Sequence, residues 1–160
     1  MTTSITTFPN REPVLFAGIM ATLILGSAFG FQLAGYPPCE LCWWQRYPYM
    51  AIMAVSLLAT AVKALPQKWV LVVLSLLFAT DAGIAAFHFG VEQRWWEGLA
   101  TCSSFVGMTD NINDALKAVM DAPLIRCDEI AWSLFGISMA GYNFLIATVM
   151  AVFCLGKARS

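Results

Sequence analysis

The sequence has few charged side chains, a single histidine and no glycine-rich nucleotide-binding fingerprint. Lys, Arg, Asp and Glu make up 12% of its 160 residues, whereas hydrophobic residues make up 59%. Soluble domains average about 25% charged and roughly 45–50% apolar residues, so this composition indicates a membrane protein. The net charge of −1 gives no indication of nucleic-acid binding. One histidine excludes bis-histidine haem ligation within the chain, and the missing fingerprint argues against a bound nucleotide.

Four apolar segments approach the ~20 residues that a helix needs to cross a bilayer. We expect one all-α membrane domain over residues 1–160, built as a bundle of four transmembrane helices. The first span is expected to be retained, because it is longer than the apolar core of a signal peptide and no small-x-small cleavage site precedes a soluble domain. The predicted spans cover residues of about 14–33, 47–65, 69–89 and 131–155.

Positive charge is shared unevenly between the two sides of the predicted bundle. The side that carries both termini has five basic residues against a single Glu12: Arg11, Lys63, Lys68, Lys157 and Arg159. The segment 91–130 has three basic residues against seven acidic ones. The positive-inside rule therefore predicts cytoplasmic termini, with the connections at about 34–46 and 90–130 on the outer side.

The long outer connection contains a candidate surface helix. Thr109-Asp110-Asn111 can cap a short helix with apolar residues on one face and charged residues on the other, and Pro123 follows as a stop. We predict a helix that lies on the membrane surface. An amphipathic helix packed on the protein itself is the open alternative.

Cys39-Glu40-Leu41-Cys42 forms a Cys-x-x-Cys pair just before the second predicted span. The positive end of a helix dipole stabilises a thiolate at a helix N-terminus and lowers its pKa. Arg46 follows Cys42 by four residues, which places both on one helix face if the helix has already started. Pro48 either marks the first helical turn or kinks the helix. The motif predicts a reactive dithiol beside a guanidinium.

A second pair of cysteines, Cys102 and Cys127, lies in the long outer connection. Two dithiols on one oxidising face can exchange electrons through mixed disulfides. A stabilising disulfide and a four-cysteine zinc site are the alternatives. The 24 residues between Cys102 and Cys127 are a poor spacing for zinc, so we expect no metal. Cys154, at the inner end of the last span, is interpreted as a small buried apolar residue.

Two ionisable residues, Asp81 and His88, lie on one face of the third predicted span, where such groups are candidates for function. A dithiol that is used catalytically needs an electron acceptor, and a membrane quinone is one that a bare four-helix protein can reach. We predict that Arg46 stabilises the Cys42 thiolate and negative charge on the quinone, with His88 as a proton donor. A snorkelling Arg46 and a merely solvated His88 are the alternatives. Asp81 is expected to pair with another helix.

Together these features closely resemble the disulfide bond formation protein B (DsbB) family of bacterial inner-membrane thiol oxidases. The resemblance rests on four spans, the Pro38-Cys39-x-x-Cys42 opening, Arg46 and a cysteine pair in the second outer loop. The vitamin K epoxide reductase family also has a four-helix core with two cysteine pairs, but its Cys-x-x-Cys comes after the loop pair. The order in this sequence favours the first family.

The resemblance implies a protein-thiol:quinone oxidoreductase of the bacterial inner membrane that supports disulfide bond formation, with both outer loops in the periplasm. Its cofactor would be ubiquinone or menaquinone, and its partner a periplasmic thioredoxin-like oxidant of the DsbA type. Cys42 would face the quinone with Cys39 as its disulfide partner. The DsbA-type protein would attack Cys102, and Cys127 would pass electrons to Cys39.

The resemblance also extends to residues beyond the thiols. Arg46 matches the quinone-contacting arginine of the family, and His88 resembles a histidine that the family places near the quinone. Trp43-Trp44-Gln45 are variable positions that could tune the potential or the substrate, and Asp81 has no counterpart. A hypothesis from a different class is a non-catalytic membrane scaffold whose cysteines form structural disulfides or a zinc site.

Overall fold

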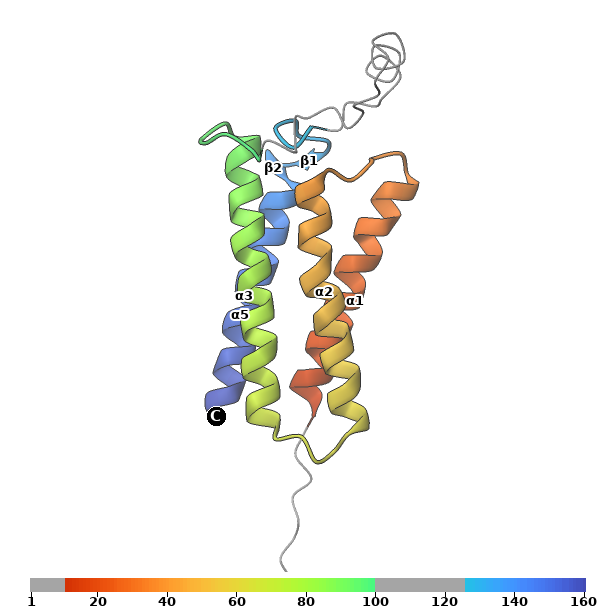
Figure 1. The fold of residues 1–160 in the computed structure, drawn as a ribbon, viewed down its shortest axis with the longest axis vertical. Coiled ribbons are helices and arrows are strands. Elements are labelled where there is room, and N and C mark those ends of the chain that lie inside the picture. Colours follow the sequence, from red (N-terminus) through yellow and green to blue (C-terminus); the bar gives the residue numbers. More distant parts are fainter. Residues whose placement is uncertain (1–10, 100–125) are drawn as a thin grey trace, which may run out of the picture.

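The computed structural model describes residues 11–99 and 126–160, which form four long helices and one short hairpin (Figure 1). Successive helices run in opposite directions. The start of α2 therefore meets the end of α3 at one end of the bundle, called here the thiol end. The elements are α1 (Glu12–Leu33), α2 (Glu40–Ala61), α3 (Gln67–Glu92), β1 (Ser133–Leu134), β2 (Ile137–Ser138) and α5 (Met139–Arg159).

The all-helical architecture is as predicted, and three of the four helices are long and apolar enough to cross a membrane: α1, α3 and α5. The α2 helix is as long as α1, but Gln45, Arg46 and Pro48 make its first half less apolar. The transmembrane character of α2, and with it the four-span count, stays a prediction. The predicted surface helix after Thr109 lies outside the described residues.

Two helices begin at residues other than the starts of the spans predicted from the sequence. The helix of the second segment begins at Glu40, seven residues before the predicted start, because the Cys39 sulfur caps it by accepting a hydrogen bond from the Cys42 backbone N–H. The fourth helix begins only at Met139, rather than near residue 131. The apolar residues before it form the β1–β2 hairpin, whose turn has φ of 49° at Phe135 and 79° at Gly136, values that a helix does not contain. Ser138 then caps α5.

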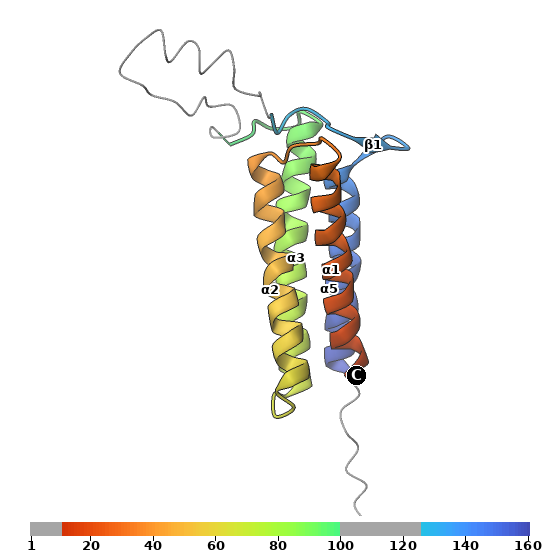
Figure 2. The same cartoon turned by 90° about the vertical axis from the view of Figure 1, so that its right-hand side faces the viewer.

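The helices pack unevenly. The α3 helix packs most extensively on α5 and also on α2, whereas α1 packs mainly on α2 and touches α3 and α5 at few places. At Gly18 α1 lies close to α2, because an added Cβ there would lie 2.8 Å from Ser56 Cβ. Figure 1 shows α1 at the right-hand edge of the bundle next to α2, with α3 and α5 on the opposite side, and Figure 2 views the bundle from the side of α1. Limited contact between α1 and α5 leaves room inside the bundle at the thiol end.

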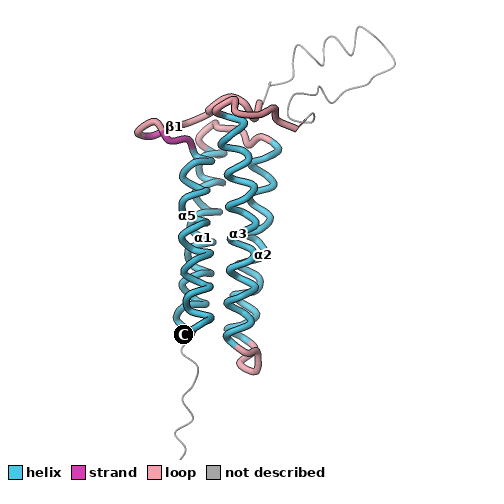
Figure 3. The backbone as a smooth tube through the Cα atoms, turned by 90° about the vertical axis from the view of Figure 1, so that its left-hand side faces the viewer, coloured by secondary structure: helices cyan, strands magenta, loops and turns pink. Residues whose placement is uncertain are grey.

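Two separate clusters of buried side chains hold the bundle together. The larger one fills the middle and the end opposite the thiols, with Phe78, Leu74 and Ile52 among its fully buried members. The smaller one lies at the thiol end and contains Cys39 and Cys127. The hairpin extends sideways from this end (Figure 3), and the Trp132 ring before it packs on Phe31 of α1 at 5.2 Å between centroids. The connecting segments thus cover the thiol end.

Candidate active site

The two thiols of the Cys-x-x-Cys pair lie at the N-terminus of α2, as the sequence predicts. Both are free thiols, and their sulfurs are 3.0 Å apart. The Cys39 thiol donates to the Cys42 sulfur, while the Cys42 backbone N–H donates to the Cys39 sulfur at 3.3 Å. The first N–H groups of a helix have no carbonyl partner within the helix. The Cys39 sulfur accepts from one of them, and this hydrogen bond holds the two thiols in position.

The two thiols, which both lie outside the predicted span 47–65, differ in acidity. The pKa of Cys42 is lowered chiefly because Cys39 donates a hydrogen bond to its sulfur. Burial opposes this shift, and the charge of Arg46 assists it. The pKa of Cys39 is raised by the same hydrogen bond and by burial. Cys42 is therefore the member of the pair that holds negative charge more readily.

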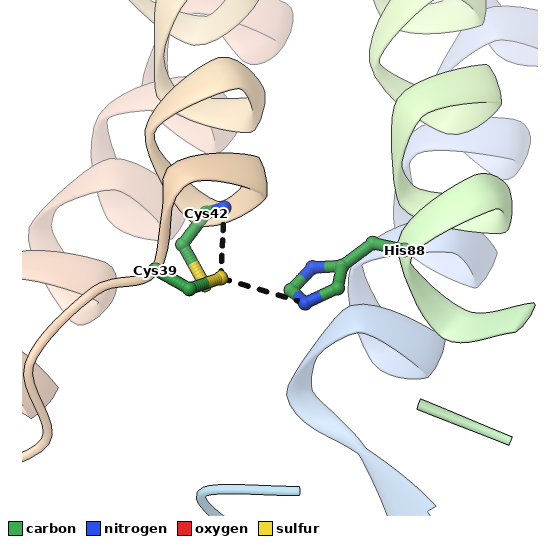
Figure 4. Close-up of side chains that lie close together, drawn as sticks. All are labelled: Cys39, Cys42 and His88. Carbon is green, nitrogen blue, oxygen red and sulfur yellow. Dashed lines mark hydrogen bonds between the residues drawn. The ribbon is translucent and has the colours of Figure 1, made fainter. Parts of the chain in front are cut away.

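His88 of α3 faces the dithiol (Figure 4). Its Nε2 lies 3.5 Å from the Cys39 sulfur, and the ring is 4% exposed. The buried Glu92 carboxylate lies one helical turn further on, with Oε1 3.9 Å from His88 Nε2, and Ser138 donates a hydrogen bond to its other oxygen. The alternative of a solvated interfacial histidine is wrong, since burial and the sulfur contact hold His88 inside the site.

The structure brings one of the two loop cysteines to the same place. Cys127 is disulfide-bonded and 2% exposed. It belongs to the same buried cluster as Cys39, and its backbone interacts with the His88 ring. Cys102 lies outside the described residues. Cys154 is a free, fully buried thiol in α5, in the larger cluster, which agrees with its predicted apolar role.

Arg46 is buried rather than snorkelling, with 5% of its surface exposed. Its Nη1 donates to Gln32 Oε1 at 2.7 Å, and its Nη2 donates to the Ala28 carbonyl at 3.2 Å. The guanidinium also lies over the rings of Phe29 and Trp43, at 4.6 and 4.5 Å from their centroids. Within the described part of the chain, its buried Nε has no hydrogen-bond partner. One donor of a firmly held guanidinium is left over.

A cavity of about 550 Å³ joins these groups. Its walls come from all four helices and from the segments before α2 and around the hairpin, and α1 and α5 make little contact with each other. Most of the lining is apolar, and its polar members include the predicted site residues and their neighbours: Cys39, Cys42, Gln45, Arg46, His88 and Glu92. A mostly apolar cavity with a few convergent polar groups is typical of a small-molecule site.

Sequence reasoning missed Gln45 and Asn143, which form a buried hydrogen-bonded chain between His88 and Asp81. The Gln45 side-chain nitrogen lies 2.8 Å from His88 Nδ1. Asn143 of α5 donates both to Gln45 Oε1, at 2.7 Å, and to Asp81 Oδ2, at 3.0 Å. Asp81 does pair with another helix, as expected, and Gln45 is a buried member of the same network. A polar residue within an apolar span was the signal for Asn143.

The thiols and His88 are also the only group of three metal-binding side chains in the described residues that converges closely enough for one ion. Their ligand atoms all lie within 4.8 Å of one another. A tetrahedral zinc with Zn–S of ~2.3 Å would hold two sulfurs about 3.8 Å apart. The observed 3.0 Å is too short for that geometry. The arrangement is that of a hydrogen-bonded thiol pair.

Comparisons with known proteins give matches over most of the chain. A family model described as disulfide bond formation protein DsbB matches residues 10–156. The disulfide bond formation protein B of Acidovorax sp. (strain JS42) is 31% identical, over 94% of this chain and 88% of the relative. The disulfide bond formation protein B 2 of Pseudomonas syringae pv. syringae (strain B728a) is 28% identical, over 89% and 85%. An uncharacterized Rickettsia prowazekii protein is 28% identical, over 74% and 69%. No solved structure matches the chain.

Proposed function

The chain belongs to the disulfide bond formation protein B family, and on that premise we propose that it is a protein-thiol:quinone oxidoreductase. It reoxidises a periplasmic thioredoxin-like dithiol protein of the DsbA type and passes the electrons to ubiquinone or menaquinone. The distribution of Lys and Arg supports an orientation with both termini in the cytoplasm and the thiol end in the periplasm of a bacterial inner membrane.

The observation that carries the proposal is the shared cavity. Cys42, Arg46 and His88 all line one mostly apolar space of about 550 Å³. The buried Nε of Arg46 has no hydrogen-bond partner among residues 11–99 and 126–160. It is a donor that suits a quinone carbonyl oxygen, and the apolar walls suit a ring and its isoprenoid chain. The residues present therefore fit a quinone, which Cys42 and Arg46 would hold between α1 and α2.

The proposed reaction uses the dithiol as a two-electron carrier. When bound, a quinone supplies an acceptor for two electrons and two protons. Cys39 and Cys42 lose their thiol protons and form a disulfide, and the partner dithiol then reduces that disulfide again, so atoms and electrons balance. The lowered pKa of Cys42 makes it the thiolate of the pair. Arg46 binds and orients, and His88 holds a proton beside Cys39.

The route between the two cysteine pairs is proposed from packing. Cys127 and Cys39 belong to one buried cluster, so an exchange between them needs only a short movement of the loop. Thiol–disulfide exchange proceeds through a mixed disulfide. In this proposal the thiolate of the partner attacks the Cys102 sulfur, and Cys127 then passes the electrons to Cys39.

A steady-state assay tests the function. Purified protein in detergent is mixed with reduced DsbA-type partner and a soluble quinone analogue, and quinone absorbance is followed. Cys42→Ser is expected to abolish turnover, whereas Cys154→Ser, a matched change of a buried thiol remote from the site, retains it. Undiminished turnover in Cys42→Ser would refute the proposal.

A zinc-holding scaffold is the competing hypothesis, since Cys39, Cys42 and His88 converge. Metal analysis of the purified protein and thiol counting after mild reduction separate the two. One zinc released for each chain would support the scaffold. Four redox-exchangeable thiols without metal support the oxidase.

A further inference from the structure

We infer that a buried chain of polar side chains fixes His88 as the neutral tautomer that carries its proton on Nε2, facing the Cys39 sulfur. The chain consists of Gln45, Asn143 and Asp81, from three different helices. None of them touches the sulfurs, so they are positioning residues. Their role in thiol chemistry rests on the function proposed above, whereas the tautomer itself does not.

The first anchor of this chain is a backbone carbonyl. A carbonyl can only accept a hydrogen bond, so the atom of Gln45 that lies 3.2 Å from the Leu41 oxygen must be its NH₂ group. The same nitrogen lies 2.8 Å from His88 Nδ1. With one N–H on Leu41 and the other on His88, the Gln45 amide donates to Nδ1, and Nδ1 therefore carries no proton.

The Asp81 end of this series of hydrogen-bonded side chains independently predicts the same orientation of the Gln45 amide. The Asp81 carboxylate is fully buried, and its Oδ2 accepts from Asn143 at 3.0 Å. Tyr49 donates to the Asn143 side-chain oxygen, so the second N–H of Asn143 points to Gln45 Oε1 at 2.7 Å. An oxygen of Gln45 on that side again leaves its NH₂ group for the imidazole. Both ends thus fix one orientation of each amide.

The proton of a neutral imidazole must then be on Nε2. A doubly protonated ring is excluded by the Gln45 donor, because two N–H groups would point at each other across 2.8 Å. Nε2 faces the Cys39 sulfur at 3.5 Å and the Glu92 carboxylate at 3.9 Å. Both are acceptors, and the sulfur is the nearer of these two side-chain groups; the Cys127 backbone, which also interacts with the ring, is a third acceptor.

The consequence is a fixed donor at the dithiol. Cys39 must give up its proton when the disulfide with Cys42 forms, and the Nε2–H stabilises the negative charge that then develops on its sulfur. The other tautomer would present a lone pair to that sulfur instead. Asp81, which has no counterpart among the family features that the sequence suggested, thereby acquires a role at a distance.

Nuclear magnetic resonance of the ring nitrogens tests the inference directly, because the chain has a single histidine. Reduced full-length protein labelled with ¹⁵N-histidine in detergent micelles gives one pair of ring signals at neutral pH. We expect Nε2 in the protonated range and Nδ1 in the unprotonated range. The reverse assignment, or two protonated nitrogens, would overturn the inference.

Three variants sharpen the test. Gln45→Glu replaces the donor with an acceptor of the same size, and Nδ1 is expected to shift into the protonated range. Asp81→Asn keeps an acceptor for Asn143 and should preserve the wild-type signals, whereas Asp81→Leu removes it and should move Nδ1 toward the average of the two tautomers. Gln67→Glu, at the other end of α3, adds the same charge as a control and should change neither signal. Unchanged signals in Gln45→Glu contradict the inference.

The failure of this inference is separable from failure of the proposed function. The wild-type spectrum needs neither quinone nor partner and does not depend on how well a variant folds. If the protein reduces quinone but carries the His88 proton on Nδ1, only the inference about the tautomer is refuted. Protein with the proton on Nε2 that does not turn over keeps the tautomer and overturns the oxidase.

Discussion

Replacing Arg46 with alanine should weaken quinone use more than any other single change outside the thiols. The guanidinium is 5% exposed and held by two hydrogen bonds, to Gln32 and to the Ala28 carbonyl. Those bonds orient it within α1 and α2, while Nε remains without a partner among the described residues. Alanine removes the free donor and the positive charge together.

The expected magnitude follows from the loss of one charged hydrogen bond. Such a bond contributes roughly 1.5–3 kcal/mol, and about 1.4 kcal/mol corresponds to a factor of ten in affinity. The apparent quinone KM of Arg46→Ala should therefore rise roughly tenfold to a hundredfold. Arg46→Lys keeps the charge but has no planar guanidinium that can donate to both Gln32 and Ala28. Its quinone KM should therefore lie between those of the wild type and Arg46→Ala.

The assay varies the quinone analogue at a saturating concentration of reduced partner and records the initial rate of quinone reduction. Arg159→Ala is the matched control, since Arg159 is an exposed arginine at the opposite end of the bundle, and it should leave the KM unchanged. Thermal unfolding in the same detergent checks that both variants fold. An Arg46→Ala protein that folds and keeps the wild-type KM would refute the proposed contact.

Three further predictions concern acidity and packing at the thiol end. The alkylation rate of Cys42 should rise with pH earlier than that of an ordinary thiol, because its pKa is lowered, and Cys39→Ala should move that profile to higher pH by removing the S–H donor. Gly90→Ala should lower the free energy of unfolding by about 1–3 kcal/mol, since a Cβ there would lie 2.0–2.6 Å from Trp96 ring atoms. Ser138→Ala should lower the free energy of unfolding by roughly 1–3 kcal/mol, because it removes the cap of α5 and the hydroxyl that donates to the buried Glu92 carboxylate. Mass spectrometry of alkylated peptides and unfolding in detergent measure these effects.

Gly83→Ala is the control for packing, because a Cβ at this helical glycine meets nothing within 4 Å, and it should not destabilise the protein. Thr148→Ala is the control for Ser138, because its hydroxyl bonds only to a carbonyl of its own helix. A pH profile of Cys42 that does not respond to Cys39→Ala would contradict the sulfur–sulfur hydrogen bond.

The placement of the dithiol could be predicted from sequence because its causes are local. Cys39 and Cys42 lie beside the start of a helix that hydrophobicity reveals, and Arg46 follows within one turn. Local spacing thus places three site residues on one helix. The same reasoning placed His88 and Asp81 on one face of α3, where the structure finds both buried.

The start of the fourth helix could not be predicted because hydrophobicity does not report backbone conformation. Ala131, Trp132 and Leu134 are as apolar as a span, yet the turn at Phe135 and Gly136 requires positive φ, and Ser138 caps the helix only after it. The hydrogen-bonding role of Gln45 could not be predicted for a different reason. Its partner Asn143 is 98 residues away, and only the packing of α3 against both α2 and α5 brings the two amides together.

A single-turnover experiment tests the central claim most directly. Protein whose Cys39–Cys42 pair has been reduced is mixed with excess quinone analogue in the absence of any partner protein. The account predicts one quinol for each chain and the appearance of a disulfide between these two cysteines, identified by mass spectrometry. A stable dithiol with no quinol formed would contradict it.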